Sequence, residues 1–251
     1  MRPPQSTTPR ERTTRSDRTG RPLVGVLAVK DLALAKTRLA EQLSTGIRAR
    51  LVLAMMRDTV AVLHRSGAAG VVVVSPDPRV LAAAEESGAR VLAESATPGA
   101  STRGHAQLNR AFVAGSTVAA HAWEDPRVML VQADLPAARA DHLATAADLA
   151  IGTARAIITD RDGSGTTLLV VDRAGELTDR PPRFGSGSAR RHVAQGATDL
   201  STLRGHPPWP DLRTDVDTLE DLAVAAHLGT GDHTRAVIAE LHASGALSQT
   251  G

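Results

Sequence analysis

The sequence contains no cysteine and no tyrosine, and aromatic residues make up only 2% of the chain. Without cysteine the chain has no disulfide, no thiolate metal ligand and no cysteine nucleophile. Proteins that bind single-stranded nucleic acid stack bases on aromatic side chains, so the shortage of aromatics disfavours that function. The missing thiols also suit a reducing compartment, and we expect a cytoplasmic protein.

Long apolar runs are missing too. No run of about 18 apolar residues occurs, which predicts that the chain does not span a membrane. Residues 1–21 lack the apolar segment of a secretory signal. They are rich in Pro, Thr, Ser and Arg and show no apolar periodicity. We therefore expect a disordered, arginine-rich tail over 1–21 and a single domain over 22–245.

The basic character of the chain comes from this tail. The isoelectric point is about 9.8, a value typical of nucleic-acid-binding proteins. However, the tail carries six Arg against Glu11 and Asp17, a net charge of +4, whereas the whole chain is only +2. The remainder is therefore slightly acidic, and we expect no nucleic-acid partner.

Beyond the tail, short apolar runs alternate with stretches in which apolar residues recur at helical spacing. The runs predict strands at 23–29, 70–75, 89–94 and 127–132. The spacing predicts helices at 47–64, 78–88, 107–123 and 140–150. Strands that are apolar throughout and separated by helices indicate an α/β fold with a mostly parallel, Rossmann-like sheet and helices on both faces.

The rhythm changes after residue 150. The apolar segments 154–160 and 166–172 are separated by the glycine-rich turn "RDGSG", which predicts a β-hairpin addition in the C-terminal half. Two more helices are expected at 219–229 and 234–245.

Polar segments follow the predicted strands, where open α/β sheets bind their ligands. The loop after the first strand holds Lys30 and Lys36, the two lysines among 29 basic residues. This loop lacks both G-x-G-x-x-G and the Walker pattern, so backbone groups alone would hold a phosphate weakly and cationic side chains would have to contribute. The other interpretation is that both lysines are solvated loop cations.

Acidic side chains make up a second candidate group. Asp215 and Asp217 lie two residues apart, so in an extended segment they share one face. Together with Asp134, which follows the strand at 127–132, they would offer the oxygen ligands that suit Mg²⁺ or Mn²⁺. The same residues could instead cap a helix, in "DTLED", or end a strand, in "ADLP".

Two small-residue loops could bind an anion. They are "RDGSGTT" at 161–167 and "RFGSGS" at 183–188, with Arg190, Arg191 and His192 beside the second. Loops of this kind can present backbone N–H groups to an anion, although most are simply loops. Together they suggest a small phosphorylated or carboxylated acid as substrate.

In sum these segments resemble the CofC/FbiD family, the guanylyltransferases of coenzyme F-420 biosynthesis. The resemblance runs from about Leu23 to Leu228 and rests on six segments in family order: "LAVKDLALAKTRLA", "VVVVSPD", "VQADLP", "ITDRDGSGTT", "RFGSGSARRH" and "RTDVDTLEDL". It implies a fold similar to the MobA-like nucleotidyltransferases of molybdenum-cofactor biosynthesis.

The resemblance also implies a reaction. A member of the bacterial branch would transfer GMP from GTP to phosphoenolpyruvate, release pyrophosphate, and pass the labile enolpyruvyl-diphospho-guanosine to a downstream enzyme of F-420 biosynthesis. A homodimer is compatible with it. The archaeal branch would use 2-phospho-L-lactate, which these residues do not distinguish, and guanine preference does not follow from them either. The D-x-D pattern at Asp215 and Asp217 keeps a glycosyltransferase-like enzyme as an alternative.

Site residues follow from the resemblance position by position. The metal ligands would be Asp134, Asp215 and Asp217. The catalytic residues would be Lys36 and Asp134. The phosphoenolpyruvate-binding residues would be Thr166, Gly185 and Ser188. The nucleotide-binding residues would be Lys30, Lys36, Arg38 and Asn109.

Overall fold

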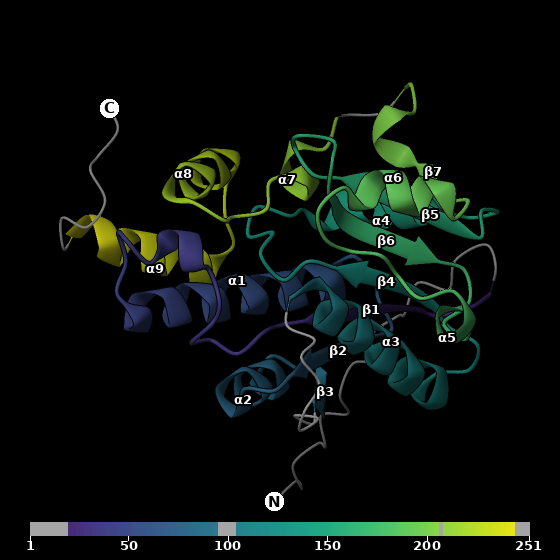
Figure 1. Cartoon of the computed structure of the whole chain (residues 1–251), viewed down its shortest axis with the longest axis horizontal. Coiled ribbons are helices and arrows are strands. Elements are labelled where there is room, and N and C mark those ends of the chain that lie inside the picture. Colours follow the sequence, from purple (N-terminus) through teal and green to yellow (C-terminus); the bar gives the residue numbers. More distant parts are fainter. Residues whose placement is uncertain (1–19, 95–103, 206–207, 244–251) are drawn as a thin grey trace, which may run out of the picture.

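The computed structural model describes residues 20–94, 104–205 and 208–243, so most of the predicted tail lies outside the described residues. The described part contains one seven-stranded sheet with the strand order β3-β2-β1-β4-β6-β5-β7 (Figure 1). The strands are β1 (Leu23–Ala28), β2 (Gly70–Ser75), β3 (Arg90–Ala93), β4 (Arg127–Val131), β5 (Arg155–Thr159), β6 (Thr166–Val171) and β7 (Thr198–Asp199).

The sheet is mostly parallel, as predicted. β3, β2, β1 and β4 pair in parallel, and β7 pairs in parallel with β5. β6 pairs antiparallel with both of its neighbours, β4 and β5. The predicted hairpin is therefore β5–β6, and its second strand is inserted next to β4. Because β6 runs in reverse, its first residue, Thr166, lies at the edge where the parallel strands end.

The long helices lie where helical periodicity predicts them, within about two residues at each end. They are α1 (Thr45–Arg65), α2 (Pro78–Glu86), α3 (His105–Ala122), α4 (Ala140–Leu149), α8 (Leu219–Leu228) and α9 (Asp232–Ala243). Residues 244–245, predicted to end the last helix, lie outside the described residues. No described helix has the length and apolar character needed to cross a membrane.

Several short elements were not predicted, because two to seven residues are too few to show a period. They are η1 (Thr37–Leu39), α5 (Glu176–Asp179), α6 (Ser188–Ala194), η2 (Leu200–Thr202), α7 (Pro210–Arg213) and the two-residue strand β7.

Helices cover both faces of the sheet, because alternate strand residues point to opposite faces. In β1, Val26 belongs to the core that contains Phe112 of α3, whereas Leu27 belongs to the core that contains Met55 of α1. α3 lies so close to the sheet that a Cβ at Gly115 would stand 2.6 Å from a methyl of Val26. Such contact between helix and strand fixes the height of α3 over the sheet.

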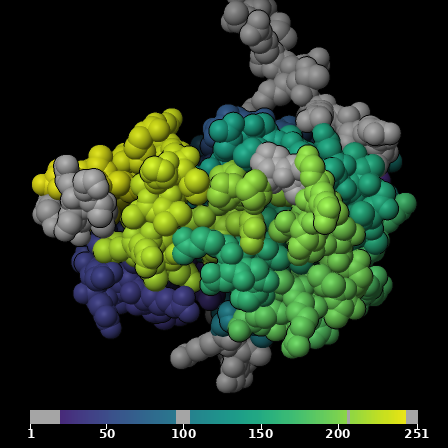
Figure 2. Space-filling view, turned by 90° about the horizontal axis from the view of Figure 1, so that it is seen from above, coloured from purple at the N-terminus to yellow at the C-terminus, as the bar shows by residue number. Residues whose placement is uncertain are grey.

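The C-terminal helices pack back on the N-terminal third of the chain. In Figure 2 the yellow C-terminal segment borders the purple segment that contains the start of α1. The buried carboxylate of Asp58 in α1 accepts hydrogen bonds from the backbone N–H groups of His233 (3.1 Å) and Thr234 (2.8 Å) in the first turn of α9. A carboxylate at a helix N-terminus satisfies free N–H groups and matches the helix dipole. Asp58 thereby docks α9 onto α1.

Candidate functional site

A cavity of about 660 Å³ opens at the edge of the sheet where the parallel strands end. Nine of the ten predicted site residues line it, although they come from segments far apart in the chain. They are Lys30, Lys36, Arg38, Asp134, Thr166, Gly185, Ser188, Asp215 and Asp217. The tenth, Asn109, is not among its lining residues. The structure brings these residues to one place, and their individual roles stay predictions.

The lysine loop is held in place by a side chain that follows β2. The buried carboxylate of Asp77 accepts a hydrogen bond from the backbone N–H of Leu32 (3.2 Å) and pairs with Arg79 at 2.8 Å. These contacts, led by the hydrogen bond from Arg79, lower the pKa of Asp77, so it stays ionised. Further along the loop, Lys36 has a left-handed backbone with φ 51°. That conformation is uncommon outside glycine and is typical of residues at functional sites.

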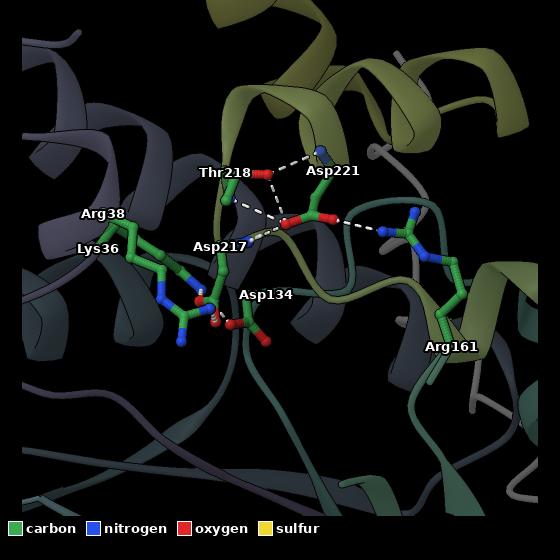
Figure 3. Close-up of polar contacts among 7 residues, drawn as sticks. All are labelled: Lys36, Arg38, Asp134, Arg161, Asp217, Thr218 and Asp221. Atoms are coloured by element: carbon green, nitrogen blue, oxygen red, sulfur yellow. Dashed lines mark hydrogen bonds and ion pairs between the residues drawn. The ribbon is translucent and has the colours of Figure 1, made fainter. Parts of the chain in front are cut away.

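The ammonium of Lys36 lies between two of the predicted metal ligands (Figure 3). Its Nζ donates hydrogen bonds to Asp134 Oδ2 and to Asp217 Oδ1, the latter at 2.8 Å. The Lys36 side chain is only 11% exposed. Burial lowers its pKa, but Asp134 and Asp217 outweigh that effect and raise the pKa above the ordinary lysine value. Lys36 is therefore a permanent cation in this cluster, and Arg38 adds a weaker contact to Asp217 at 3.4 Å.

A backbone hydrogen bond joins the two acidic segments. The N–H of Val216 donates to the carbonyl oxygen of Asp134 at 3.1 Å, and Val216 is completely buried. The carboxylates of Asp134 and Asp217 consequently contact the same ammonium although 83 residues separate them in the sequence. The metal hypothesis requires this proximity.

Helix capping and the acidic cluster use different residues. Thr218 is the N-cap of α8 and forms a capping box with Asp221, whose carboxylate also pairs with Arg161 at 2.8 Å. In Figure 3 Arg161 approaches from the side opposite Lys36. The backbone N–H of Asp217 donates to Asp221 (3.2 Å), while its own carboxylate faces Lys36. The observed cap at Thr218 and the proposed metal site at Asp217 are therefore compatible.

The cluster carries more negative charge than Lys36 compensates. The pKa of Asp215 is raised to about 7, first by burial and then by Asp134 and Asp217. Asp217 is only partly buried, which tends to raise its pKa, but Lys36 outweighs this effect and the pKa is lowered. The Oδ1 atom of Asp134 is buried and has no hydrogen-bond partner within the described residues. A buried carboxylate oxygen without a hydrogen-bond partner is costly, so a further cation beside this oxygen would be favourable.

The donor set fits a divalent cation in kind, since all three side chains offer oxygen. In the described part of the chain, however, no three acidic or histidine side chains converge closely enough to surround an ion as they stand. Lys36 occupies the space between two of them. An ion would have to share or take over those carboxylates.

The predicted acid-binding residues form a compact group on the cavity wall, around Thr166 at the start of β6. Thr166 Oγ1 contacts Ser188 Oγ and His192 Nδ1, each at 3.0 Å, and all three residues are buried. Gly185 has φ +118°, and a Cβ there would lie 2.4 Å from the His105 ring. Only glycine fits this close approach to the cavity wall.

Two N–H groups of the loop at 161–167 are not available to an anion in the cavity. The carboxylate of Asp160 accepts hydrogen bonds from the N–H groups of Ser164 (2.9 Å) and Gly165 (2.8 Å). Arg213 in turn holds the carbonyl oxygen of Asp160 at 2.9 Å. These two N–H groups are therefore already used within the loop, which is braced by Asp160. Asp160 follows β5 just as Asp134 follows β4, so the same strand-end pattern could have identified it.

Asn109 supports the second loop from behind. Its amide nitrogen donates to the carbonyl oxygens of His105 (2.8 Å) and Phe184 (3.1 Å), and its amide oxygen accepts from the N–H of Phe184 (2.8 Å). Its observed contacts therefore hold the backbone just before Gly185. The predicted nucleotide contact of Asn109 stays a prediction.

Comparison with known proteins gives a family match over nearly the whole described chain. Residues 24–250 match the family model described as "Guanylyl transferase CofC like". A phosphoenolpyruvate guanylyltransferase from Nocardia farcinica is 44% identical over 219 residues, covering 86% of this chain and 90% of the relative. The enzyme of that name from Mycobacterium leprae is 39% identical, covering 86% of this chain and 94% of the relative.

Solved structures share the fold at lower identity. A nucleotidyl transferase from Methanothermobacter superimposes with a TM-score of 0.54 at 18% identity, covering 82% of this chain and 97% of that one. The 4-diphosphocytidyl-2C-methyl-D-erythritol synthase of Anaerococcus prevotii gives 0.52 at 12% identity, covering 84% and 97%. At this identity the likeness concerns the arrangement of strands and helices, and it confirms the predicted fold class.

Proposed function

The chain belongs to the family of CofC-like guanylyl transferases, and from that premise we propose that it transfers GMP from GTP to phosphoenolpyruvate and releases pyrophosphate. Relatives 39% and 44% identical carry the name phosphoenolpyruvate guanylyltransferase. One observation carries the proposal: a single cavity holds three kinds of group. They are the cationic loop with Lys30, Lys36 and Arg38, the acidic cluster of Asp134, Asp215 and Asp217, and the hydroxyl-lined subsite of Thr166, Gly185 and Ser188. These are the three kinds of group that a reaction between two phosphates requires.

The reaction forms one P–O bond and breaks another. A phosphate oxygen of phosphoenolpyruvate attacks the α-phosphorus of GTP, and the bond from that phosphorus to the bridging oxygen of the β-phosphate breaks. A phosphate monoester is largely dianionic at neutral pH, since its second pKa is about 6. No general base is needed, so the protein acts by positioning and by charge.

The cationic loop supports the nucleotide. Lys36 and Arg38 lie at the cavity wall with Lys30, the other lysine of the loop. Lys36 carries its charge at any working pH because Asp134 and Asp217 raise its pKa. A compact ammonium on a flexible stem can follow a phosphate that moves as the bond breaks. We assign Lys36 to the β- and γ-phosphates, which leave as pyrophosphate.

The acidic cluster supports a divalent cation. Asp134, Asp215 and Asp217 would hold Mg²⁺ or Mn²⁺, which when bound would neutralise charge shared by the two reactants. The raised pKa of Asp215 and the unpartnered Oδ1 of Asp134 favour this assignment. Binding of an ion to Asp134 and Asp217 would also release the Lys36 ammonium toward the phosphates.

The hydroxyl-lined subsite supports the acid substrate. The carboxylate or phosphate of phosphoenolpyruvate would bind against Thr166, Gly185 and Ser188, which line this part of the cavity. Ser188 would act through Thr166, because its hydroxyl donates to Thr166 Oγ1 at 3.0 Å and fixes that hydroxyl before the substrate arrives. The product, enolpyruvyl-diphospho-guanosine, would serve coenzyme F-420 biosynthesis and pass to a downstream enzyme.

A screen of pyrophosphate release tests the proposal. The purified chain is incubated with Mg²⁺ and each of the four ribonucleoside triphosphates, with phosphoenolpyruvate or 2-phospho-L-lactate as acceptor. We expect the fastest release with GTP and phosphoenolpyruvate. Release that does not depend on phosphoenolpyruvate would contradict the proposed acceptor, and faster release with 2-phospho-L-lactate would replace it. A parallel trial with GDP- and UDP-sugars addresses the glycosyltransferase alternative that the D-x-D pattern raises.

A further inference from the structure

His192 is a buried histidine directly behind the hydroxyl-lined subsite, and its side chain has no exposed surface. Its Nε2 lies 2.8 Å from the backbone nitrogen of Arg183, which donates the hydrogen bond. A backbone N–H can only donate, so Nε2 must be the acceptor and carries no proton. The tautomer of the ring is thereby determined by the main chain.

The proton of the neutral ring then lies on Nδ1. This atom is 3.0 Å from Thr166 Oγ1, so the ring donates a hydrogen bond to the threonine hydroxyl. Burial, followed by the charges of Arg155 and Arg191, lowers the pKa of His192 to about 4. The ring therefore stays neutral at ordinary working pH. Phe184 contacts it edge-on at 5.2 Å between ring centroids and helps to fix its plane.

Thr166 receives a second hydrogen bond on the same oxygen. Ser188 Oγ donates to Thr166 Oγ1 at 3.0 Å. A hydroxyl oxygen has two lone pairs, and His192 and Ser188 occupy both. Thr166 Oγ1 makes no third hydrogen bond within the described residues, and Thr166 lines the cavity. Its own hydrogen is left over for a group that enters the cavity.

We propose that His192 is a positioning residue that fixes the Thr166 hydroxyl as a hydrogen-bond donor to the acid substrate. Acting through Thr166, it makes this part of the subsite selective for a group that only accepts, such as a carboxylate or phosphate oxygen. A substrate hydroxyl or amide that needs an acceptor finds none at this oxygen. The inference rests on the proposed function, because it concerns the subsite assigned to phosphoenolpyruvate.

Two substitutions of His192 distinguish the roles of the two ring nitrogens. The amide nitrogen of asparagine falls near the position of Nδ1, so His192→Asn keeps a donor for Thr166 and loses the acceptor for the Arg183 N–H. The amide oxygen of glutamine reaches the position of Nε2, so His192→Gln keeps that acceptor and loses the donor. A purely structural role predicts that activity follows stability in both variants.

The positioning role predicts a split between the two variants. We expect His192→Gln to raise the KM for phosphoenolpyruvate by about tenfold or more, the range for losing one ordered hydrogen bond to a charged group. His192→Asn should raise it by less, even where its melting temperature falls further. The KM for GTP should stay near the wild-type value in both. Equal effects of both variants on the two KM values would overturn the inference.

A double-variant cycle adds the link through Thr166. Thr166→Val removes the hydroxyl and keeps the shape, so it should raise the KM for phosphoenolpyruvate by itself. In that background His192→Gln should cause no further rise, because the donor it orients is gone. Fully additive effects would show that His192 does not act through Thr166.

The tautomer provides a readout that needs no substrate. In a ¹⁵N-histidine NMR spectrum at pH 7, we expect His192, assigned by its loss in His192→Asn, to show a protonated Nδ1 and an unprotonated Nε2. A protonated Nε2 would overturn the inference while leaving the proposed function intact. Absence of wild-type turnover with phosphoenolpyruvate would instead contradict the proposed function, and the assignment of the substrate to Thr166 would fall with it.

Discussion

Lys36 is expected to oppose metal binding and to support catalysis. Its ammonium contacts Asp134 and Asp217, so it supplies positive charge at the position proposed for a metal ion. The same ammonium is assigned to the leaving phosphates. Removing it should therefore change metal binding and turnover in opposite directions.

For Lys36→Met we expect turnover with GTP to fall by about a hundredfold or more, because an electrostatic contact to the leaving group is lost. We expect tighter Mn²⁺ binding in the absence of nucleotide, because the competing cation is gone, measured by the electron paramagnetic resonance signal of free Mn²⁺. Lys30→Met, the same chemical change in the same loop, serves as control and should tighten Mn²⁺ binding less. Unchanged turnover would remove the assigned role of Lys36.

Gly185 is a second position where a single added carbon atom should change substrate binding. Gly185→Ala places a Cβ 2.4 Å from the His105 ring at φ +118°, whereas Gly187→Ala, at φ +67°, meets its nearest atom, a nitrogen of Arg191, only at 3.8 Å. Both substitutions strain the backbone, but only the first meets a side-chain clash. We therefore expect Gly185→Ala to raise the KM for phosphoenolpyruvate several-fold more than Gly187→Ala, and steady-state kinetics measures the difference. Adding His105→Ala should restore part of the loss, and no restoration would argue against the clash.

At the scale of elements, the start of α8 joins the cap and the acidic cluster. Thr218 caps the helix through Asp221, and the preceding Val216 binds the backbone of Asp134. The cap therefore fixes the backbone from which Asp217 extends toward Lys36. Loosening it should affect both stability and the site.

Thr218→Ala should lower the free energy of unfolding by about 1 kcal/mol, the usual effect of losing an N-cap. It should also weaken Mn²⁺ binding, because Asp217 loses its fixed backbone. Thr218→Ser keeps the hydroxyl and should stay near the wild type in both measurements. Denaturant unfolding and titration with Mn²⁺ check the two effects separately. If Thr218→Ala loses stability but binds Mn²⁺ normally, the cap does not position Asp217.

At the scale of the whole molecule, His192 links the site to stability against acid. Its folded-state pKa is lowered to about 4 from the ordinary 6.5, by burial and by Arg155 and Arg191. Below pH 6.5 the unfolded chain takes up a proton that the native chain does not, so stability present above pH 6.5 is lost as pH falls toward 4.

This loss should amount to roughly 3 kcal/mol between pH 6.5 and 4. The measurement is the free energy of unfolding in urea at several pH values, for the wild type and for His192→Asn, in which residue 192 no longer titrates. The wild type should lose more stability than the variant across this window. Parallel curves would show that His192 is not buried in its neutral form.

How much could be predicted depended on whether a feature repeats along the chain. The long helices and buried strands carry a period of 3.6 or an unbroken apolar run, so α1 and β2 were predicted nearly at their observed ends. α6, with seven residues, carries no such signal. The position of the cavity was predicted because polar residues follow the strands, and open α/β sheets bind ligands at that edge.

The roles of single polar residues were harder to predict because a side chain's partner is set by the fold. Asn109 is predicted to bind the nucleotide, and only the structure shows that its amide contacts the backbone of His105 and Phe184. Asp160 was not singled out, although it braces the loop before Thr166. No local pattern distinguishes a carboxylate that faces a cavity from one that folds back on its own loop.

The sequence by itself determined the class of fold, the family and the edge of the sheet at which the site lies, because periodicity and motif order are properties of the chain. Only the tertiary structure decided that Lys36 lies between Asp134 and Asp217 and that His192 faces Thr166. It also decided that β6 runs in reverse and brings its first residue to the cavity. These contacts join residues 26 to 181 positions apart, and their geometry follows from packing in three dimensions.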